Sequence, residues 1–114
     1  LPIYGDSVSR ELIHWAGCEL GELANAVIRQ LEFESLVFDV VLAGSMFEGG
    51  SLLTDPMRET ILRVAPGARF VRLDAPPVAG AVLMGMEMGG LAPHAGIRTR
   101  LMEAIQLARQ AGVR

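Results

Sequence analysis

The residues best suited to chemistry in this chain lie in the stretch Phe38–Gly50, which reads FDVVLAGSMFEGG. An unbroken apolar run there ends at Gly44, and Ser45 follows directly. Because these two residues carry little or no side chain, the backbone beside them could lie against a flat or phosphorylated ligand. The run by itself is equally consistent with a glycine that only turns the chain. A main-chain binding site and a plain turn are therefore both open interpretations.

Other residue sets with familiar chemistry are missing or scattered. The chain has no GxGxxG after a strand and no Walker A sequence, and its histidines do not have metal-ligand spacing. Ser45, Asp74 and His94 contain the groups of a nucleophilic triad, but nothing in their spacing brings them together, and we interpret them as coincidence. Asp39, Asp55 and Asp74 stand at expected ends of strands or helices, where capping explains them. We assign no catalytic residue and no metal ligand to this chain.

Two expected strands position the candidate site. Val37–Ala43 is short and apolar, which is typical of a strand buried on both faces of a parallel sheet. Ala68–Leu73 is less hydrophobic and is expected nearer a sheet edge. Between them, Asp55 and Pro56 predict the opening of a helix. A helix that joins two strands gives a right-handed unit with parallel strands, so Gly44 is predicted at the carboxyl edge, where ligands of such sheets collect.

A long helix is predicted before the first strand. Apolar residues recur at helical spacing over residues 8–31, and Asp6 or Ser7 can cap the start. Gly17 and Gly21 lie inside this helix four residues apart. Because glycine weakens a helix, the pair predicts a close packing contact with another element.

Two further helices are predicted after the second strand. Val78–Met88 is apolar on nearly all sides, which predicts a helix in the interior. Its residues Met84, Met86 and Met88 are interpreted as core filling rather than as contacts to a cofactor. Pro93–Gly112 has an apolar side and a side rich in arginine, which predicts a final amphipathic helix.

Composition limits the class of protein. The 114 residues suffice for one domain, 1–114, and 51% of them are hydrophobic while 20% are charged, which suggests surface that something else covers. The net charge of −3 argues against nucleic acid as a partner. No apolar run reaches the length that crosses a bilayer, so no membrane contact is expected. The single cysteine, Cys18, excludes an internal disulfide and fits a reducing cytoplasm, where we expect the protein.

Two stretches resemble a known family. VVLAGS, followed by Phe47 and further glycines, looks like the adenosine motif of the actin, sugar-kinase and heat-shock-chaperone ATPase superfamily. Ala75–Gly85, which reads APPVAGAVLMG, is similar to the end of the N-acetylglucosamine kinase and BadF/BadG/BcrA/BcrD ATPase family. The order of the expected elements also agrees, so the resemblance covers nearly the whole chain. It departs at Ser45, where many members carry a second glycine.

The resemblance implies a fold, a site and an activity. The fold would be a partial RNase H-like (actin-like ATPase) half-domain, an α/β fold of order α-β-α-β-α-α with a small parallel sheet flanked by helices. Gly44 and Ser45 would contact the adenosine of ATP, bound with Mg²⁺, and Met46 and Phe47 would lie near the base. The chain would be the C-terminal fragment of a larger two-domain kinase, which transfers the γ-phosphate to a hydroxyl of N-acetylglucosamine or a related amino sugar. The phosphate loop, the catalytic aspartate and most sugar contacts would come from the absent amino-terminal half, so this chain alone is expected to be inactive.

Two alternatives stay open. A BadF-type ATPase that activates a reductase through an iron–sulfur cluster would need bridging cysteines, and Cys18 in mid-helix is not suitably placed for that. A non-catalytic interaction or dimerisation module would keep the fold and lose the chemistry. Because the strand Val37–Ala43 would lack a neighbour on one edge in the chain as given, we also expect homo-oligomers, formed edge to edge or through the long first helix.

Overall fold

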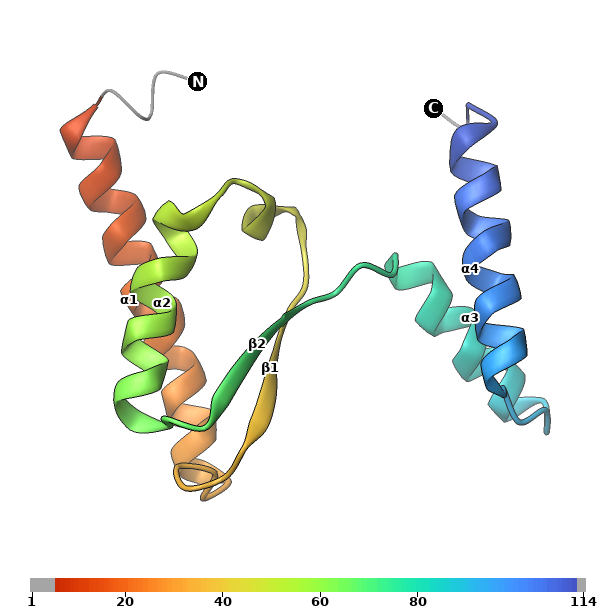
Figure 1. Ribbon diagram of the computed structural model, residues 1–114, viewed down its shortest axis with the longest axis horizontal. Coiled ribbons are helices and arrows are strands. Elements are labelled where there is room, and N and C mark those ends of the chain that lie inside the picture. The colour runs from red at the N-terminus through yellow and green to blue at the C-terminus, as the bar shows by residue number, and fades with distance from the viewer. Residues whose placement is uncertain (1–5, 113–114) are drawn as a thin grey trace. The chain divides into compact units, whose positions relative to one another are not determined.

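The computed structural model describes residues 6–112 (Figure 1). These residues form an α/β protein in the expected order, with α1 (Ser7–Gln30), β1 (Phe38–Leu42), the 3₁₀-helix η2 (Ser45–Glu48), α2 (Ser51–Val64), β2 (Ala68–Arg72), α3 (Pro77–Met88) and α4 (Ala95–Gln110). The chain divides after Leu73 into two compact units. The first unit contains α1, α2 and the sheet, and the second contains α3 and α4.

Helix α1 begins where the sequence predicted. The Asp6 carboxylate accepts hydrogen bonds from the Val8 N–H (3.0 Å) and from Ser9 Oγ (2.8 Å), which satisfies a donor that the first turn leaves without an intrahelical partner. The helix ends at Gln30, and Glu32 then takes a positive φ of 57° that turns the chain toward β1. The predicted long helix and its cap are confirmed.

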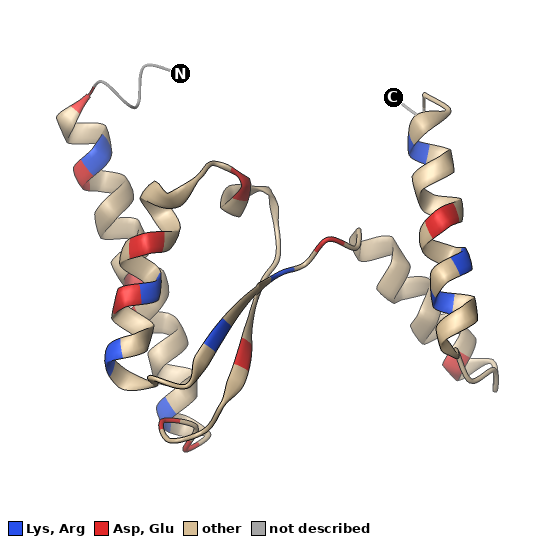
Figure 2. Ribbon diagram, in the orientation of Figure 1, with Lys and Arg blue, Asp and Glu red and all other residues tan. Residues whose placement is uncertain are grey.

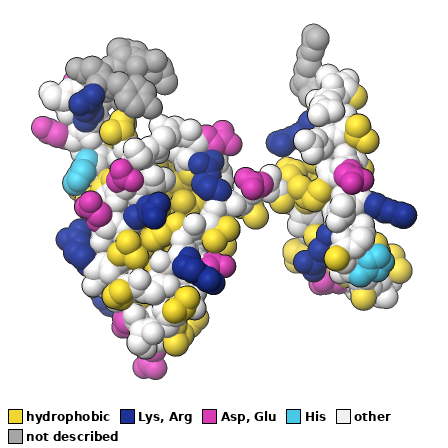
Figure 3. Space-filling view, in the orientation of Figure 1, with side chains coloured by type: hydrophobic (Ala, Val, Ile, Leu, Met, Phe, Trp, Pro, Cys, Tyr) yellow, Lys and Arg dark blue, Asp and Glu magenta, His cyan; other side chains and the backbone are white. Residues whose placement is uncertain are grey.

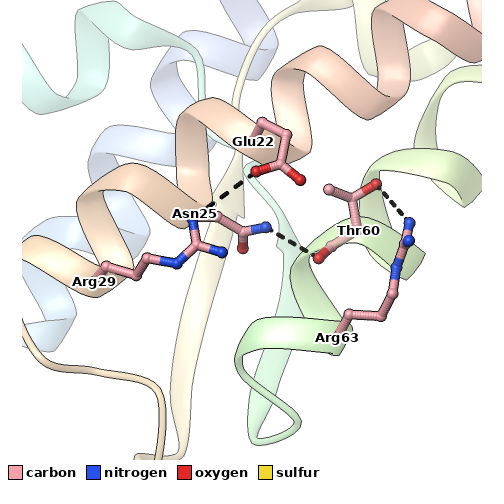
Figure 4. Close-up of polar contacts among 5 residues, drawn as sticks. All are labelled: Glu22, Asn25, Arg29, Thr60 and Arg63. Carbon is pink, nitrogen blue, oxygen red and sulfur yellow. Dashed lines mark hydrogen bonds and ion pairs between the residues drawn. The ribbon is translucent and has the colours of Figure 1, made fainter.

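The predicted close contact at the α1 glycines is also confirmed. A Cβ on Gly17 would lie 2.6 Å from Pro56 Cγ, and a Cβ on Gly21 would lie 2.6 Å from Thr60 Cβ. One turn further along α1, the buried Asn25 points at α2 and donates from Nδ2 to the Thr60 carbonyl (3.0 Å), as Figure 4 shows. Small residues and one buried amide therefore allow α1 and α2 to pack at short range.

The start of α2 differs from the prediction. Asp55 and Pro56 do not open the helix, which begins at Ser51 after Gly50, a residue with a φ of 94°. Pro56 instead lies inside α2, buried against Gly17. A proline there removes one hydrogen bond to the preceding turn, yet the helix continues. The Thr60 hydroxyl donates to the Pro56 carbonyl (2.8 Å), so a side chain adds a bond beside this gap in the backbone ladder.

The sheet contains two parallel strands, as predicted, with Val40 paired to Phe70 and Leu42 paired to Arg72. The prediction that β1 is buried on both faces is wrong. Leu42 is 7% exposed on the face that packs against the core, whereas Val41 on the opposite face is 57% exposed. Within the first unit α1 and α2 supply the core on one side of the sheet. Its buried members are Ile28, Leu42, Met57, Ile61, Ala65 and Ala68.

The second unit is a pair of helices. His94 caps α4, and its Nδ1 accepts from the Gly96 N–H (3.1 Å). The prediction that α3 is an interior helix is wrong for this unit, because a single partner helix can cover only one side of it. Met84 and Met88 are exposed, the latter at 88%, so they are not core filling.

Candidate functional site

The turn after β1 is built around Gly44. This residue has a φ of 110° and a ψ of 158°, a conformation that is essentially reserved for glycine. It is exposed, and no atom outside its chain neighbours lies within 4 Å of the position where a Cβ would stand. Residues Val40–Leu42 are in a strand, and the Gly44–Ser45 peptide is accessible. A bare stretch of main chain therefore lies at the carboxyl end of β1.

The other predicted site residues form η2, directly after Gly44. Ser45 and Met46 are exposed, while Phe47 is half-buried and packs against the core of the first unit. The Phe47 N–H donates to the Gly44 carbonyl (3.4 Å), which closes the turn. The structure thus brings the four predicted residues together in one short turn, with two side chains free to face a ligand and one anchored inward.

A residue that the sequence analysis did not single out holds this turn. Arg72, the last residue of β2, donates from Nη1 to the carbonyl of Phe47. Arg72 is paired with Leu42 in the sheet, so its backbone lies beside the end of β1. The only sequence signal for this role is an arginine at the end of the second predicted strand, and that signal needs the register of the sheet to be interpreted.

Charged residues surround the sheet. Figure 2 shows basic residues along β2 and acidic residues on β1 and on the turn that follows it. Asp39 pairs with Arg69 across the strands (2.9 Å), and the Arg58 guanidinium lies over the Phe70 ring at 5.0 Å from its centroid. The capping interpretation of Asp39 is therefore wrong, because it lies within β1 and forms a cross-strand ion pair. Asp55, exposed inside α2, is not a cap either.

Among the hollows on the described residues are three that lie away from this turn. An apolar one of about 230 Å³ lies between the end of α1 and β1, and two of about 500 Å³ are more polar. The first is lined by Ala24, Val27, Ile28, Leu31, Phe33, Phe38, Asp39 and Val40; the second by Asp74, Pro76, Met102, Ile105, Gln106, Arg109 and Gln110; the third by Arg10, Glu11, His14 and Leu52. None of the three is lined by Gly44, Ser45, Met46 or Phe47. The first three of these residues are exposed, so the candidate site lies on a surface turn.

His94 and Cys18, which the sequence offered for other chemistry, make contacts within their own helices. His94 Nδ1 accepts the capping hydrogen bond of α4. Cys18 lies in α1 with its Sγ 3.9 Å from Nδ1 of His14, one turn earlier in the same helix. Within residues 6–112, no three His, Cys, Asp or Glu side chains gather closely enough to hold a metal ion.

Comparisons of the chain with family profiles, with curated proteins and with solved structures found no match. In the part of the chain that the structure describes, no helix has the length and apolar character that would let it cross a membrane.

Proposed function

We propose that this chain is the nucleotide-side portion of an ATP-dependent kinase with the actin-like, RNase H-like fold, and that Gly44, Ser45, Met46 and Phe47 contact the adenosine. The observation that carries the proposal is the conformation of Gly44: a glycine-only backbone geometry, exposed, at the carboxyl end of a strand in a parallel sheet. Ligands of parallel α/β sheets bind at this edge because helix starts and loop amides converge there.

The order of elements supports the same assignment. A helix, a strand with a glycine turn, a helix, a second parallel strand and a further apolar helix follow one another in this chain. The proposed family has this succession in its carboxyl-terminal half. The motif APPVAGAVLMG begins just after β2 and continues into α3, as the resemblance requires.

The residues present fit only part of the chemistry. An open glycine turn suits a flat base and ribose, since no side chain obstructs their approach. The described residues do not fit Mg²⁺, because no cluster of three suitable ligands exists among them, and we assign no step to that ion here. In the proposed kinase the transfer of the γ-phosphate to an amino-sugar hydroxyl depends on groups of the other half, so this chain alone is inactive. Such a kinase works in the cytoplasm, where Cys18 stays reduced.

An interaction module is the second candidate, and the outer side of α1 favours it. Large apolar side chains are exposed along the helix, with Trp15 at 61%, and the others are Val8, Leu12, Leu23 and Val27, followed by Leu31 directly after the helix. Hydrophobic side chains also reach the surface on the face drawn in Figure 3. An exposed apolar stripe of this length is typical of surface that another protein layer covers. We propose that the isolated chain covers part of it by forming homo-oligomers.

A titration with nucleosides separates the two candidates. Adenosine and ADP are added to the ¹⁵N-labelled chain, and the backbone amide signals are followed by NMR. The nucleotide proposal predicts saturable shifts at residues 44–48, and it predicts that Gly44→Ala weakens adenosine binding because the alanine Cβ strains the turn. Gly90→Ala is the matched control, since Gly90 also has a positive φ (83°) and open space around it but lies in the second unit. A pure interaction module would leave residues 44–48 unshifted up to millimolar nucleoside.

A further inference from the structure

The turn that exposes Gly44 is held by a hydrogen bond from the neighbouring strand, β2. The Phe47 side chain holds one end of η2 against the core, and the Arg72 guanidinium holds the Phe47 carbonyl from β2. We propose that Arg72 is a positioning residue of the adenosine site, which keeps η2 in the conformation that exposes the Gly44–Ser45 peptide. This inference rests on the proposed nucleotide function and adds to it a residue outside the motif.

The position of Arg72 makes the contact specific. Its Cα is paired with that of Leu42, and the N–H of the next residue, Leu73, donates to the Leu42 carbonyl (3.0 Å). The backbone of Arg72 is thereby fixed beside the last residue of β1. Its long side chain then reaches past the end of β1 to Phe47, five residues beyond Leu42. The sheet fixes the chain just before the turn, and the arginine fixes Phe47, the third residue of η2.

A fixed turn matters more here than in an enclosed pocket. Because Gly44, Ser45 and Met46 are exposed, packing against other side chains contributes little to holding them in a binding conformation. The apparent affinity of such a site falls in proportion to the fraction of molecules in which the turn has the correct shape. Because the Arg72 bond is exposed, we assign it the effect of an ordinary hydrogen bond, about fivefold in the equilibrium constant for the correct turn conformation. The competent fraction, and with it the apparent affinity, falls by at most that factor.

Arg69 supplies a matched control on the same strand. It is also an exposed arginine of β2, but its Nε lies 2.9 Å from the Asp39 carboxylate, and no hydrogen bond joins it to η2. Arg69→Met and Arg72→Met remove the same charge and the same donor group. Only Arg72→Met removes the hydrogen bond to the Phe47 carbonyl, whereas Arg69→Met removes the ion pair with Asp39.

The experiment compares wild type, Arg72→Met, Arg72→Lys and Arg69→Met in two measurements. Amide shifts and hydrogen exchange of residues 44–48 are first recorded without ligand, and adenosine is then titrated into each protein. Adenosine carries no charge, so the loss of a cation cannot weaken its binding by simple attraction. We expect Arg72→Met to alter the turn and to bind adenosine more weakly, by up to about fivefold. Arg72→Lys should fall between Arg72→Met and wild type, since an ammonium can donate to the carbonyl but lacks the planar fork.

The outcomes separate the two proposals. Wild-type binding at residues 44–48 together with unchanged affinity in Arg72→Met would overturn the role of Arg72 and leave the nucleotide site in place. If Arg69→Met weakened adenosine binding as much as Arg72→Met, the role of Arg72 would also be overturned, because loss of any arginine from β2 would then have the same effect. Absence of any response to adenosine in wild type would remove the nucleotide site and the positioning role with it, whatever the free turn shows. Because the Arg72 side chain is exposed and makes no core contact, the variants are expected to fold.

Discussion

Two residues of the first unit show how single positions shape it. Gly44 adopts a backbone geometry that other residues avoid, so it fixes the direction in which the chain leaves β1. Asp6 fixes where α1 begins, because its carboxylate accepts two hydrogen bonds from the first turn. Both hydrogen bonds favour the charged carboxylate and hold the pKa of Asp6 below its ordinary value of 3.8. The bond from Ser9 has the larger effect and the bond from the Val8 N–H the next.

The lowered pKa of Asp6 gives a prediction about pH. A carboxyl group whose pKa is lower in the folded state stabilises that state above its unfolded pKa, and the contribution is lost as the pH falls through the folded-state pKa. Asp6→Ala should therefore lower the melting temperature at neutral pH, and its difference from wild type should shrink as the pH drops below 3.8. Thermal melts followed by circular dichroism across pH measure this. Glu19→Ala, which removes an exposed carboxylate from the middle of α1, is the control, and an equal pH dependence in both variants would contradict the capping account.

At the scale of elements, the first unit depends on the contact between α1 and α2. Gly17, Gly21 and Asn25 lie one turn apart along α1 and face Pro56 and Thr60 of α2. The absence of side chains at the two glycines brings the helices together, and the Asn25 amide adds a hydrogen bond that fixes their register. Figure 4 also shows that Arg63 of α2 donates to the Thr60 hydroxyl (3.3 Å) on the outer side of this contact.

Gly21→Ala tests that packing. The new Cβ would stand 2.6 Å from Thr60 Cβ, so the helices must separate, which costs about 1–3 kcal/mol and outweighs the gain of roughly 1 kcal/mol in helix propensity. Gly80→Ala in α3 is the matched control, because no atom lies within 4 Å of its Cβ position and only the gain remains. Urea unfolding, followed by the amide signals of each unit, gives both free energies. A stabilised Gly21→Ala protein would contradict the close packing.

The same elements show what the sequence can predict. The limits of α1, the two strands and their parallel pairing followed from local signals, namely the Asp6 cap, the helical spacing of apolar residues and the short β-branched run. The start of α2 did not, because Asp55-Pro56 carries a strong helix-start signal, whereas the actual start depends on the positive φ of Gly50. The burial of β1 on one face only, which leaves Val41 exposed, depends on tertiary arrangement. The contact of Arg72 with Phe47 depends on strand register, and no local pattern contains either.

At the scale of the whole molecule, the first unit has a small core and much uncovered apolar surface. Its sheet has two strands, and no described strand pairs with the outer edge of β1. On the open face of the sheet Val41, Val71 and Leu73 are exposed. A two-stranded sheet with a free apolar edge readily pairs with another chain, so the surface of this unit favours association.

We therefore predict that the isolated chain self-associates. Sedimentation velocity at high micromolar concentration should show species larger than a monomer, and Val41→Lys should shift the distribution toward monomer because a charge on an edge strand opposes pairing. Leu107→Lys places the same charge at an equally exposed apolar position on α4 and should leave the distribution unchanged. A clean monomer of the wild-type chain at these concentrations would contradict the prediction.

Whether the turn Gly44–Phe47 receives adenosine is decided by the amide map of the wild-type chain with adenosine. We predict saturable shifts that centre on residues 44–48 and include Arg72, with little change across α3 and α4. Shifts that centre elsewhere, or no saturable response at millimolar adenosine, would contradict this prediction.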